Sequence, residues 1–455
     1  MGLDSSKENN KHAHLPSEPH RYLHEESGVI PAPLTVIREL RHTGPVEGIQ
    51  PLKVAACSFS PDDDTTLVTV TTLATPPFRT LRAGFVQCWD LEKPEEGHDS
   101  SLFTYSPRPN CPFSPDGELL SIILNSGAGQ LILVEREGCC LEPCNIQCTN
   151  GDRSLCARAL CCVFSNDGKK AVTVSNVTLE LYRGREIHEI CLWRVCSKRK
   201  VRSIWKVSCE VALPRFAGHF HSCVFSPDSS LLAISSSLGQ LYIVQGNSLE
   251  LFAAIDKETI PNNACTCAFD PRFGHKRLGA SHQKGDFRIW ELEENPGKFK
   301  CVKKKDIVEE PVELLTFAFS PDGYFIAFGL SDGKTLICDS ISLHCIHELN
   351  PGLLNIQEDE SANMNQIEAL DFAVTSLAFA KSCQEIAVGH CNGILRIWQL
   401  PLRMDLMHIC RIVITSLVSG KKIHLLPLPN SLKRFLLFSY INLNREFLLD
   451  AEESL

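Results

Sequence analysis

The sequence lacks the features that would send it into a membrane or a secretory route. It has no stretch of eighteen uninterrupted apolar residues, and its N-terminus is hydrophilic where a signal peptide would be apolar. We therefore expect no stable membrane insertion and an intracellular location, in the cytoplasm or the nucleus. Gly2 and Ser6 fit the loose N-myristoylation pattern, but no neighbouring cysteine or basic cluster supplies the second anchor that stable attachment requires.

Positive charge is also scarce. The chain has 45 Lys and Arg residues against 54 Asp and Glu, which gives a formal net charge of −9. Binding to phosphate backbones depends on concentrated Lys and Arg, so we expect no nucleic-acid partner. The basic run Ser197–Arg202 falls between two predicted strands, where a solvated turn is the default interpretation and a nuclear-import signal is the alternative.

Motifs of catalysis and metal binding are missing. We find no His-Glu-x-x-His pair and no phosphate-binding loop, so we predict a protein that is not an enzyme and that needs no cofactor. Its 22 cysteines are scattered through strand-like runs of a long chain, which predicts reduced and mostly buried thiols. The densest run lacks a Cys-x-x-Cys pair, so we predict no metal site there. This run contains Cys139, Cys140, Cys144, Cys148 and Cys156.

What the sequence does contain is one phrase repeated seven times. Each copy ends an apolar strand in an aromatic residue and a turn of the Ser-Pro-Asp-Gly type, and continues into two or three further strands. The repeated aromatics are Phe59, Phe113, Phe164, Phe225, Phe269, Phe319 and Phe379. Their spacings of 44 to 61 residues are typical of the blades of a propeller.

These copies resemble the WD-repeat family. Trp89-Asp90 is a full Trp-Asp pair, and Gly218-His219 is the clearest copy of the family's Gly-His pair. Variant copies of the motif carry Trp193, Trp290 and Trp398. The resemblance implies an all-β fold, a seven-bladed WD-repeat β-propeller over residues 35–400, preceded by a flexible lead of residues 1–34. Most copies lack the Gly-His pair and the central Asp of the family's hydrogen-bond network.

The two ends of the propeller are predicted to pair. The last copy stops at its third strand, whereas the segment Thr35–Gly44 has the pattern of a fourth strand. We predict that this segment completes the last blade, which would leave no open sheet edge between the ends.

After Leu400 the hydrophobic period changes from strand to helix. Asp405 stands where an N-cap belongs. The apolar stripe that follows consists of Leu406, Ile409, Cys410, Val413 and Leu417. Pro427 and Pro429 then forbid helix and predict an extended segment, and a second helix is expected to begin near Asn430.

This region, residues 401–440, resembles the SOCS box. Between Leu406 and Phe438, 18 of 33 residues are apolar, more than so short a unit buries by itself. The motif that binds elongin C is matched by Leu406, Cys410 and Ile414, and the motif that selects cullin-5 by Leu426, Pro427, Leu428 and Pro429. The alternative is that the stripe packs on the underside of the propeller. The tail, residues 441–455, lies outside the resemblance.

A propeller followed by this segment resembles the WD-repeat and SOCS-box protein family. The family implies a non-catalytic adaptor of a ubiquitin ligase. Its propeller would hold a protein substrate, and its box would recruit elongin B, elongin C, a cullin and a RING subunit. The alternative function is a propeller scaffold that recruits no ligase.

Long insertions predict the substrate face. Connections between second and third strands and connections between blades emerge on the same face of a propeller. The sequence lengthens the former from Ala74 and Asn176, and the latter at the cysteine-rich run and from Gly352. The first two insertions carry Arg79, Arg82, Arg183 and Arg185. We predict that these arginines bind an acidic or phosphorylated degron, the alternative being that the loops are spacers.

Overall fold

The computed structural model describes part of the 455-residue chain. The described residues are 36–41, 52–73, 84–92, 100–103, 113–124, 130–137, 140–143, 159–179, 185–198, 201–210, 220–236, 239–255, 264–272, 277–282, 285–293, 297–309, 311–351, 372–400, 425–429 and 432–433. The chain divides into two compact units. One is Ala32–Val413, and the other combines Met1–Pro31 with Ile414–Leu455.

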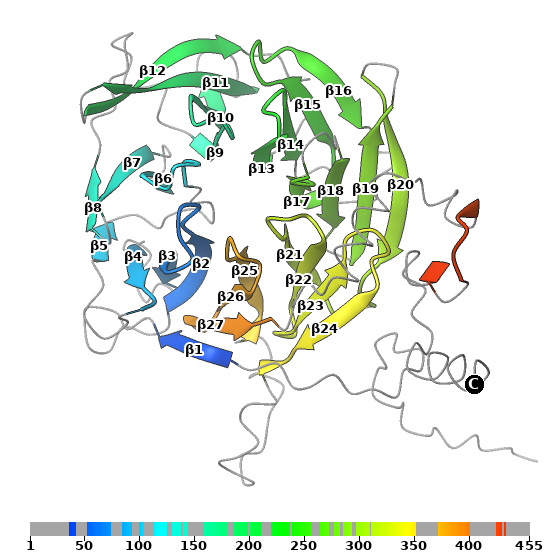
Figure 1. Cartoon of the computed structure of the whole chain (residues 1–455). Helices are drawn as coiled ribbons and strands as arrows, with labels where there is room; N and C mark the ends of the chain where they lie inside the picture. The colour runs from blue at the N-terminus through cyan, green and yellow to red at the C-terminus, as the bar shows by residue number, and fades with distance from the viewer. Residues whose placement is uncertain are drawn as a thin grey trace, which may run out of the picture. The chain divides into compact units, whose positions relative to one another are not determined.

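Antiparallel sheets make up the first unit, and Figure 1 shows them arranged as a ring. The first sheet contains β2 (Leu52–Phe59), β3 (Thr66–Leu73), β4 (Gly84–Asp90) and β5 (Ser100–Phe103). Another contains β9 (Ala159–Phe164), β10 (Lys170–Leu179), β11 (Arg185–Lys198) and β12 (Val201–Glu210). The next contains β13 (Phe220–Phe225), β14 (Leu231–Ser236), β15 (Leu241–Gln245) and β16 (Leu251–Ile255).

The remaining four-stranded sheets follow in chain order. One contains β17 (Ala264–Phe269), β18 (Arg277–His282), β19 (Asp286–Leu292) and β20 (Phe299–Asp306). The next contains β21 (Leu314–Phe319), β22 (Phe325–Leu330), β23 (Thr335–Asp339) and β24 (Cys345–Leu349). The last contains β25 (Val374–Phe379), β26 (Glu385–His390), β27 (Ile394–Gln399) and β1 (Val36–Arg41).

The described residues therefore show an all-β propeller with six four-stranded blades, where the sequence predicts seven blades. The remaining sheet has three strands, β6 (Leu119–Leu124), β7 (Gln130–Glu137) and β8 (Cys140–Pro143). The residues that precede Phe113 lie outside the described part, so no first strand is assigned to this sheet. Phe113 itself forms an isolated antiparallel bridge with Leu120.

The predicted pairing of the two ends is confirmed. Strand β1 pairs antiparallel with β27 and completes the last blade, with Glu39 opposite Arg396. The Arg396 Nε lies 3.0 Å from a Glu39 carboxylate oxygen, across 357 positions of sequence. Residues from the two ends of this unit are thus joined by a strand ladder and by an ion pair.

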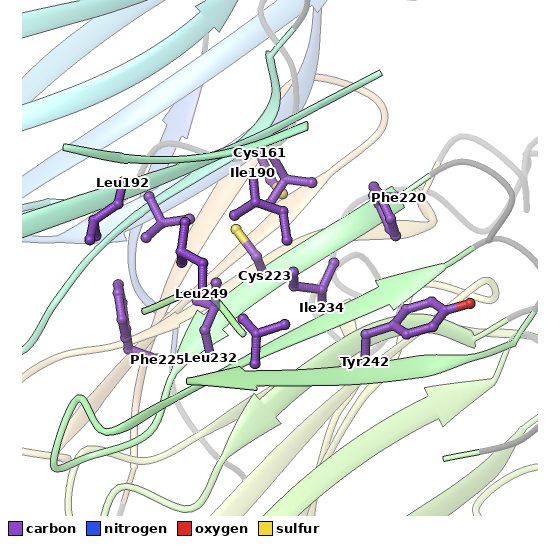
Figure 2. Packing of buried hydrophobic residues seen from close by; sticks show 13 residues of the cluster. Cys161, Ile190, Leu192, Phe220, Cys223, Phe225, Leu232, Ile234, Tyr242 and Leu249 are labelled. Carbon is purple, nitrogen blue, oxygen red and sulfur yellow. The ribbon is translucent and has the colours of Figure 1, made fainter. Parts of the chain in front are cut away.

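Burial follows the position of each strand in its blade. The second strand β14 is buried at every position, since both of its faces pack against neighbouring blades. The outermost strand β20 is largely exposed. Figure 2 shows one core between blades, where Cys161, Ile190 and Leu192 meet residues of β13 and β14, among them Cys223 and Leu232.

The cysteines with described side chains confirm the prediction of buried thiols. Nine of these twelve are buried and all twelve are free, so none is part of a disulfide. Burial raises the pKa of Cys57 and Cys162 to about 12 and that of Cys267 to about 11. Such thiols stay protonated and unreactive, because the thiolate is the nucleophile.

The repeated turns have a local structure that the sequence predicts. In five copies the serine hydroxyl donates to the carboxylate two residues ahead. These pairs are Ser60–Asp62, Ser114–Asp116, Ser165–Asp167, Ser226–Asp228 and Ser320–Asp322. The glycines Gly117, Gly168 and Gly323 have positive φ values, which explains their place in the phrase.

The same turns also connect one blade to the next, which the sequence does not reveal. A Cβ added at Gly117 would lie within 2.7 Å of side-chain atoms of Asp62 and Ser60 in the preceding blade. A second contact between neighbouring blades is a hydrogen bond in which the backbone N–H of Asn166 donates to Ser229 Oγ at 2.9 Å. Where the last blade meets the first, the Ser382 amide donates to an Asp64 carboxylate oxygen at 3.1 Å. The turn residues therefore stabilise contacts between blades as well as the hairpins.

Two of the predicted insertions prove to be partly strand. Asn176–Leu179 was expected in a loop but continues β10, paired with Arg185–His188 of β11. The hairpin is longer because its Val, Thr and Ile residues favour extended backbone. Within the cysteine-rich run, Cys140 is also not in a connection between blades, since it begins β8.

Candidate functional site

The C-terminal motif Leu426–Pro429 is described and forms a bend rather than the extended segment that the prolines predict. The Leu428 amide donates to the Leu426 carbonyl at 2.8 Å, a bond across two residues that closes a γ-turn around Pro427. Proline accommodates this turn because its ring fixes φ near the value that an inverse γ-turn needs.

The side chains of this segment are accessible. Leu425 is 72% exposed, Pro427 and Pro429 are exposed, and Leu426 and Leu428 are partly buried. After the bend, the Lys433 amide donates to the Pro429 carbonyl at 3.0 Å, the four-residue spacing of an α-helical turn. The described residues contain no complete helix, so the two predicted SOCS-box helices stay predictions.

The other predicted site residues lie largely outside the described part of the chain. This applies to Leu406, Cys410 and Ile414 of the elongin motif, and to Arg79, Arg82 and Arg183 of the substrate face. Arg185 is the first residue of β11, opposite Leu179. Arg185 was predicted to lie in a loop, but it is a strand residue next to the connection between the second and third strands of this blade.

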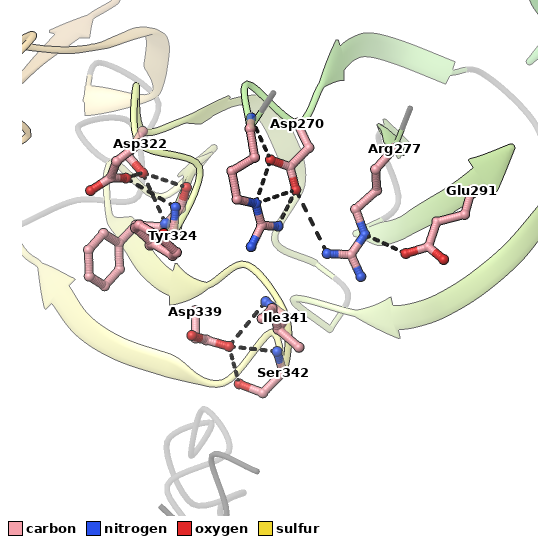
Figure 3. Close-up of polar contacts among 11 residues, drawn as sticks. Asp270, Arg277, Glu291, Asp322, Tyr324, Asp339, Ile341 and Ser342 are labelled. Atoms are coloured by element: carbon pink, nitrogen blue, oxygen red, sulfur yellow. Dashed lines mark hydrogen bonds and ion pairs between the residues drawn. The ribbon is translucent and has the colours of Figure 1, made fainter. Parts of the chain in front are cut away.

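A buried carboxylate that the sequence analysis passed over lies in the fourth complete blade (Figure 3). Asp270 is fully buried and accepts from Arg272 Nε at 2.8 Å, while Arg277 Nη1 lies 3.8 Å from its second oxygen. Arg277 also pairs with Glu291 at 2.9 Å. In this copy of the phrase, Asp-Pro-Arg replaces Ser-Pro-Asp, so the acidic side chain has moved two positions toward the N-terminus. This exchange of residue types is the signal in the sequence from which the buried cluster could have been predicted.

The Arg272 guanidinium continues this cluster into the next blade. It lies 5.7 Å from the centre of the Tyr324 ring, within the range of a cation–π contact. A Cβ at Gly323 would approach within 2.9 Å of both Asp270 Oδ1 and Arg272 Cγ. The cluster therefore joins two blades, and it occupies the place that the serine–aspartate turns hold elsewhere.

Part of the WD-repeat hydrogen-bond network survives in two blades. The Trp89 indole N–H donates to Thr69 Oγ1 at 2.8 Å, and the Trp193 indole N–H donates to Thr173 Oγ1 at 2.9 Å. Both tryptophans are buried, so each bond satisfies a donor that cannot reach water. These contacts support the resemblance of the repeats.

A polar cluster in the last blade surrounds His390. This side chain is 1% exposed, and its Nδ1 donates to the Phe372 carbonyl at 2.7 Å. Its Nε2 and the Nη1 of Arg396 have no hydrogen-bond partner among the described residues. Burial, followed by the charge of Arg396, lowers the pKa of His390 to about 4, although the Phe372 bond and Glu39 oppose the shift. His390 is therefore neutral at pH 7.

One pentapeptide matches a hydrolase motif. Gly329–Gly333 reads Gly-x-Ser-x-Gly, the pattern of a nucleophile elbow. An elbow requires a turn from strand to helix, whereas this segment joins β22 to β23 in an antiparallel hairpin. The Ser331 hydroxyl instead accepts a bond from the Glu313 amide at 2.9 Å. The motif is a blade turn.

No helix within the described ranges is long and apolar enough to cross a membrane. In the same part of the chain, no group of three or more His, Cys, Asp or Glu side chains is arranged to hold a metal ion. Four members of the cysteine-rich run, Cys139, Cys144, Cys148 and Cys156, lie outside it.

Comparison with known proteins adds one finding. The SOCS box family model matches residues 404–437, which include the bend at Leu426–Pro429. No curated protein matches the chain.

The fold and this segment define the class of protein. It is a β-propeller protein with a SOCS box near its C-terminus. Together with the Trp-bearing repeats, this arrangement is consistent with a WD-repeat and SOCS-box protein.

Proposed function

We propose that this protein is the substrate-recognition adaptor of an elongin B/C–cullin–RING ubiquitin ligase. The observation that carries the proposal is the SOCS-box match at residues 404–437 in a chain that also forms a propeller. A SOCS box suggests recruitment of the ligase, and a propeller offers a rigid scaffold whose loops bind a protein substrate. On this proposal the chain itself carries no catalytic residue and uses no cofactor.

The contact with elongin C is assigned to Leu406, Cys410 and Ile414. Their spacing of four residues places them on one face of an α-helix. The exposed Leu425 supports a partner for this region, because an isolated large apolar side chain gains free energy when a partner covers it.

The choice of cullin-5 is assigned to Leu426–Pro429. Two prolines and the γ-turn restrict this segment before binding, so docking costs little conformational entropy. Its leucines are only partly buried, which leaves apolar surface for a cullin.

Changing Leu406 and Cys410 together to polar residues, as Leu406→Gln with Cys410→Asn, is expected to abolish co-purification of elongins B and C. If each anchor side chain contributes about 2 kcal/mol or more to the binding free energy, the loss of both lowers the affinity for elongin about a thousandfold. The measurement is calorimetric titration of the purified full chain with elongin B/C. Undiminished elongin binding by a folded double variant would contradict the proposal and favour the scaffold that recruits no ligase.

The matched control replaces Leu426–Pro429 with four alanines. This variant should keep elongin binding and lose capture of cullin-5, since the two motifs contact different subunits. Equal loss of both partners would show that the segment is structural.

The substrate face is assigned to Arg79, Arg82, Arg183 and Arg185. Guanidinium groups pair bidentately with carboxylate and phosphate, which suits an acidic or phosphorylated degron. Arg185 supports the assignment because it begins β11 at the end of a long hairpin.

Charge reversal of these four arginines to glutamate is expected to remove binding of acidic and phosphorylated peptides. Loss of charge-assisted hydrogen bonds should reduce capture from a degenerate phosphoserine-peptide library by about tenfold or more. The matched control reverses the same number of exposed charges elsewhere, at Lys298, Lys300, Lys304 and Lys381. Equal capture by the two variants would place the substrate site on another surface. Elongin binding, measured in parallel, should be unchanged in both.

We also infer that the three-stranded sheet β6–β8 is the seventh blade. The bridge between Phe113 and Leu120 has the register that Phe225 and Leu232 adopt at the end of a complete first strand. The repeat phrase also places Phe113 at that position.

A further inference from the structure

Two cysteines lie directly opposite each other on the outer strands of one blade. Cys338 of β23 pairs with Cys345 of β24 in the antiparallel ladder. Directly opposed residues of such a ladder have Cα atoms about 4.5–5.5 Å apart and side chains on the same face. Disulfides form across about 4.4–6.8 Å, so the usual spacing of opposed residues in such a ladder lies within the range that a disulfide needs.

The pair results from a substitution within the repeat. In the preceding blade, the position equivalent to Cys338 is Trp290, and Trp290 lies opposite Cys301. A register shift precedes both pairs at the same place. The blade of β21–β24 has therefore replaced the motif tryptophan by a thiol and kept the outer cysteine, which puts two thiols face to face.

Cys345 and Cys301 are otherwise matched. Both are exposed, and each thiol points to the carbonyl two residues ahead at 3.4 Å, that of His347 or of Lys303. They differ in the residue that lies opposite on the neighbouring strand, which is a cysteine for Cys345 and a tryptophan for Cys301. Cys301 is thus a built-in reference for the reactivity of an exposed cysteine on an outer strand.

The surroundings favour a thiolate at Cys345. The hydrogen bond from the Cys338 thiol lowers the pKa of Cys345 and Lys305 contributes in the same direction, although desolvation by neighbouring groups and the Glu348 carboxylate oppose the shift. The Lys305 Nζ is held nearby, since it donates to the Leu343 carbonyl at 2.7 Å. By contrast, partial desolvation by neighbouring groups raises the pKa of Cys301, although its thiol is exposed. The more exposed member of the pair is therefore the more nucleophilic, and its buried partner carries the proton.

We propose that Cys338 and Cys345 form a reversible thiol–disulfide site whose oxidant is a hydroperoxide. The Cys345 thiolate attacks one peroxide oxygen and the O–O bond breaks. This yields a sulfenic acid, and the departing hydroxide or alkoxide takes up a proton. Cys338 sulfur then attacks the Cys345 sulfur, the S–S bond forms and the S–O bond breaks, and the hydroxyl leaves as water with the Cys338 proton. The two thiols lose two electrons and the peroxide gains them.

Strands β23 and β24 are neighbours at the outer side of their blade (Figure 1), so a disulfide between Cys338 and Cys345 would tie these two strands together and close the turn between them. A covalent link of this kind reduces the freedom of the unfolded chain, so the oxidised protein should melt at a higher temperature. The site is independent of ligase recruitment, and it operates whether or not the chain binds elongins.

The test treats the folded full-length protein with hydrogen peroxide and then blocks the remaining thiols. A protease that cleaves before Asp339 separates the two cysteines, so a disulfide between them appears by mass spectrometry as two linked peptides. We expect the linked pair to form, to be reversed by dithiothreitol, and to form faster by several-fold than any oxidation of Cys301. In Cys338→Ser, Cys345 should instead proceed to sulfinic acid.

Two results would overturn the proposal. One is accumulation of sulfinic acid at Cys345 in the wild type with no linked peptide. The other is equal rates of oxidation at Cys345 and Cys301. Both are measured on the unaltered protein, so they hold even if Cys338→Ser does not fold. Cys345→Ser, at an exposed position, then checks that Cys338 alone stays a thiol.

Discussion

Replacing Asp270 with serine is expected to lower the free energy of unfolding by about 4 kcal/mol, because the change leaves buried cationic groups without their counter-charge. Asp270 is fully buried and accepts from the side chain and the backbone amide of Arg272. Serine restores the residue type of the other turns but cannot balance the guanidinium. The measurement is chemical denaturation of the purified full chain.

The control for this prediction is the double variant Asp270→Ser with Arg272→Asp. It converts Asp-Pro-Arg into the Ser-Pro-Asp found at Ser60–Asp62 and Ser320–Asp322. We expect it to return to within about 1 kcal/mol of the wild type, the remainder being the lost cation–π contact with Tyr324. If the double variant instead loses the sum of the unfolding free energies that the two single substitutions cost, the exchange of charges is not what stabilises this turn.

Acidification from pH 6.5 to pH 4 is expected to remove about 3 kcal/mol of stability through His390 alone, at 1.36 kcal/mol for each unit between the ordinary pKa of 6.5 and the folded value of about 4. The unfolded chain binds the proton over this interval and the folded chain does not. Stability from this group is therefore complete above pH 6.5 and is lost as the pH falls. The measurement is unfolding free energy against pH.

The matched control is His390→Asn, because an asparagine amide can still donate to the Phe372 carbonyl at the place of Nδ1. The wild type minus this variant isolates His390 from other titrating groups, such as His344 and His347, whose pKa values burial also lowers. If the free energies of unfolding of the wild type and the variant change in parallel between pH 4 and pH 7, the His390 imidazole takes up a proton as readily in the folded state as in the unfolded state, and the prediction is wrong.

The sequence predicted the features that arise within short stretches of chain. The repeat of Phe59 and its six counterparts, with Ser-Pro-Asp-Gly turns, specified blades because strand alternation and turn residues act locally. Thr35–Gly44 was assigned to the last blade because a fourth strand was missing there, and the pairing of β1 with β27 confirmed it. The SOCS-box segment was found in the same way, from a helical stripe and a spaced proline motif.

For the candidate site residues too, the sequence predicted the motif but not its local backbone conformation. Leu426–Pro429 lies within the segment that the SOCS-box family model matches, but its γ-turn was not foreseen, since two prolines are compatible with both an extended chain and a turn. The strand character of Asn176–Leu179 was missed because loop and strand differ little in composition over four residues.

By itself, the sequence determined a repeated β architecture and a segment that matches the SOCS box. Only the tertiary structure decided that Asp270 and Arg272 replace a serine–aspartate turn against Gly323, that Cys338 lies opposite Cys345, and that His390 is buried beside Arg396. The physical reason is that charge balance, thiol pairing and burial depend on neighbours brought together by strand register and blade packing. Residue periodicity specifies each strand, but it does not specify which side chains the neighbouring strand or blade will place beside it.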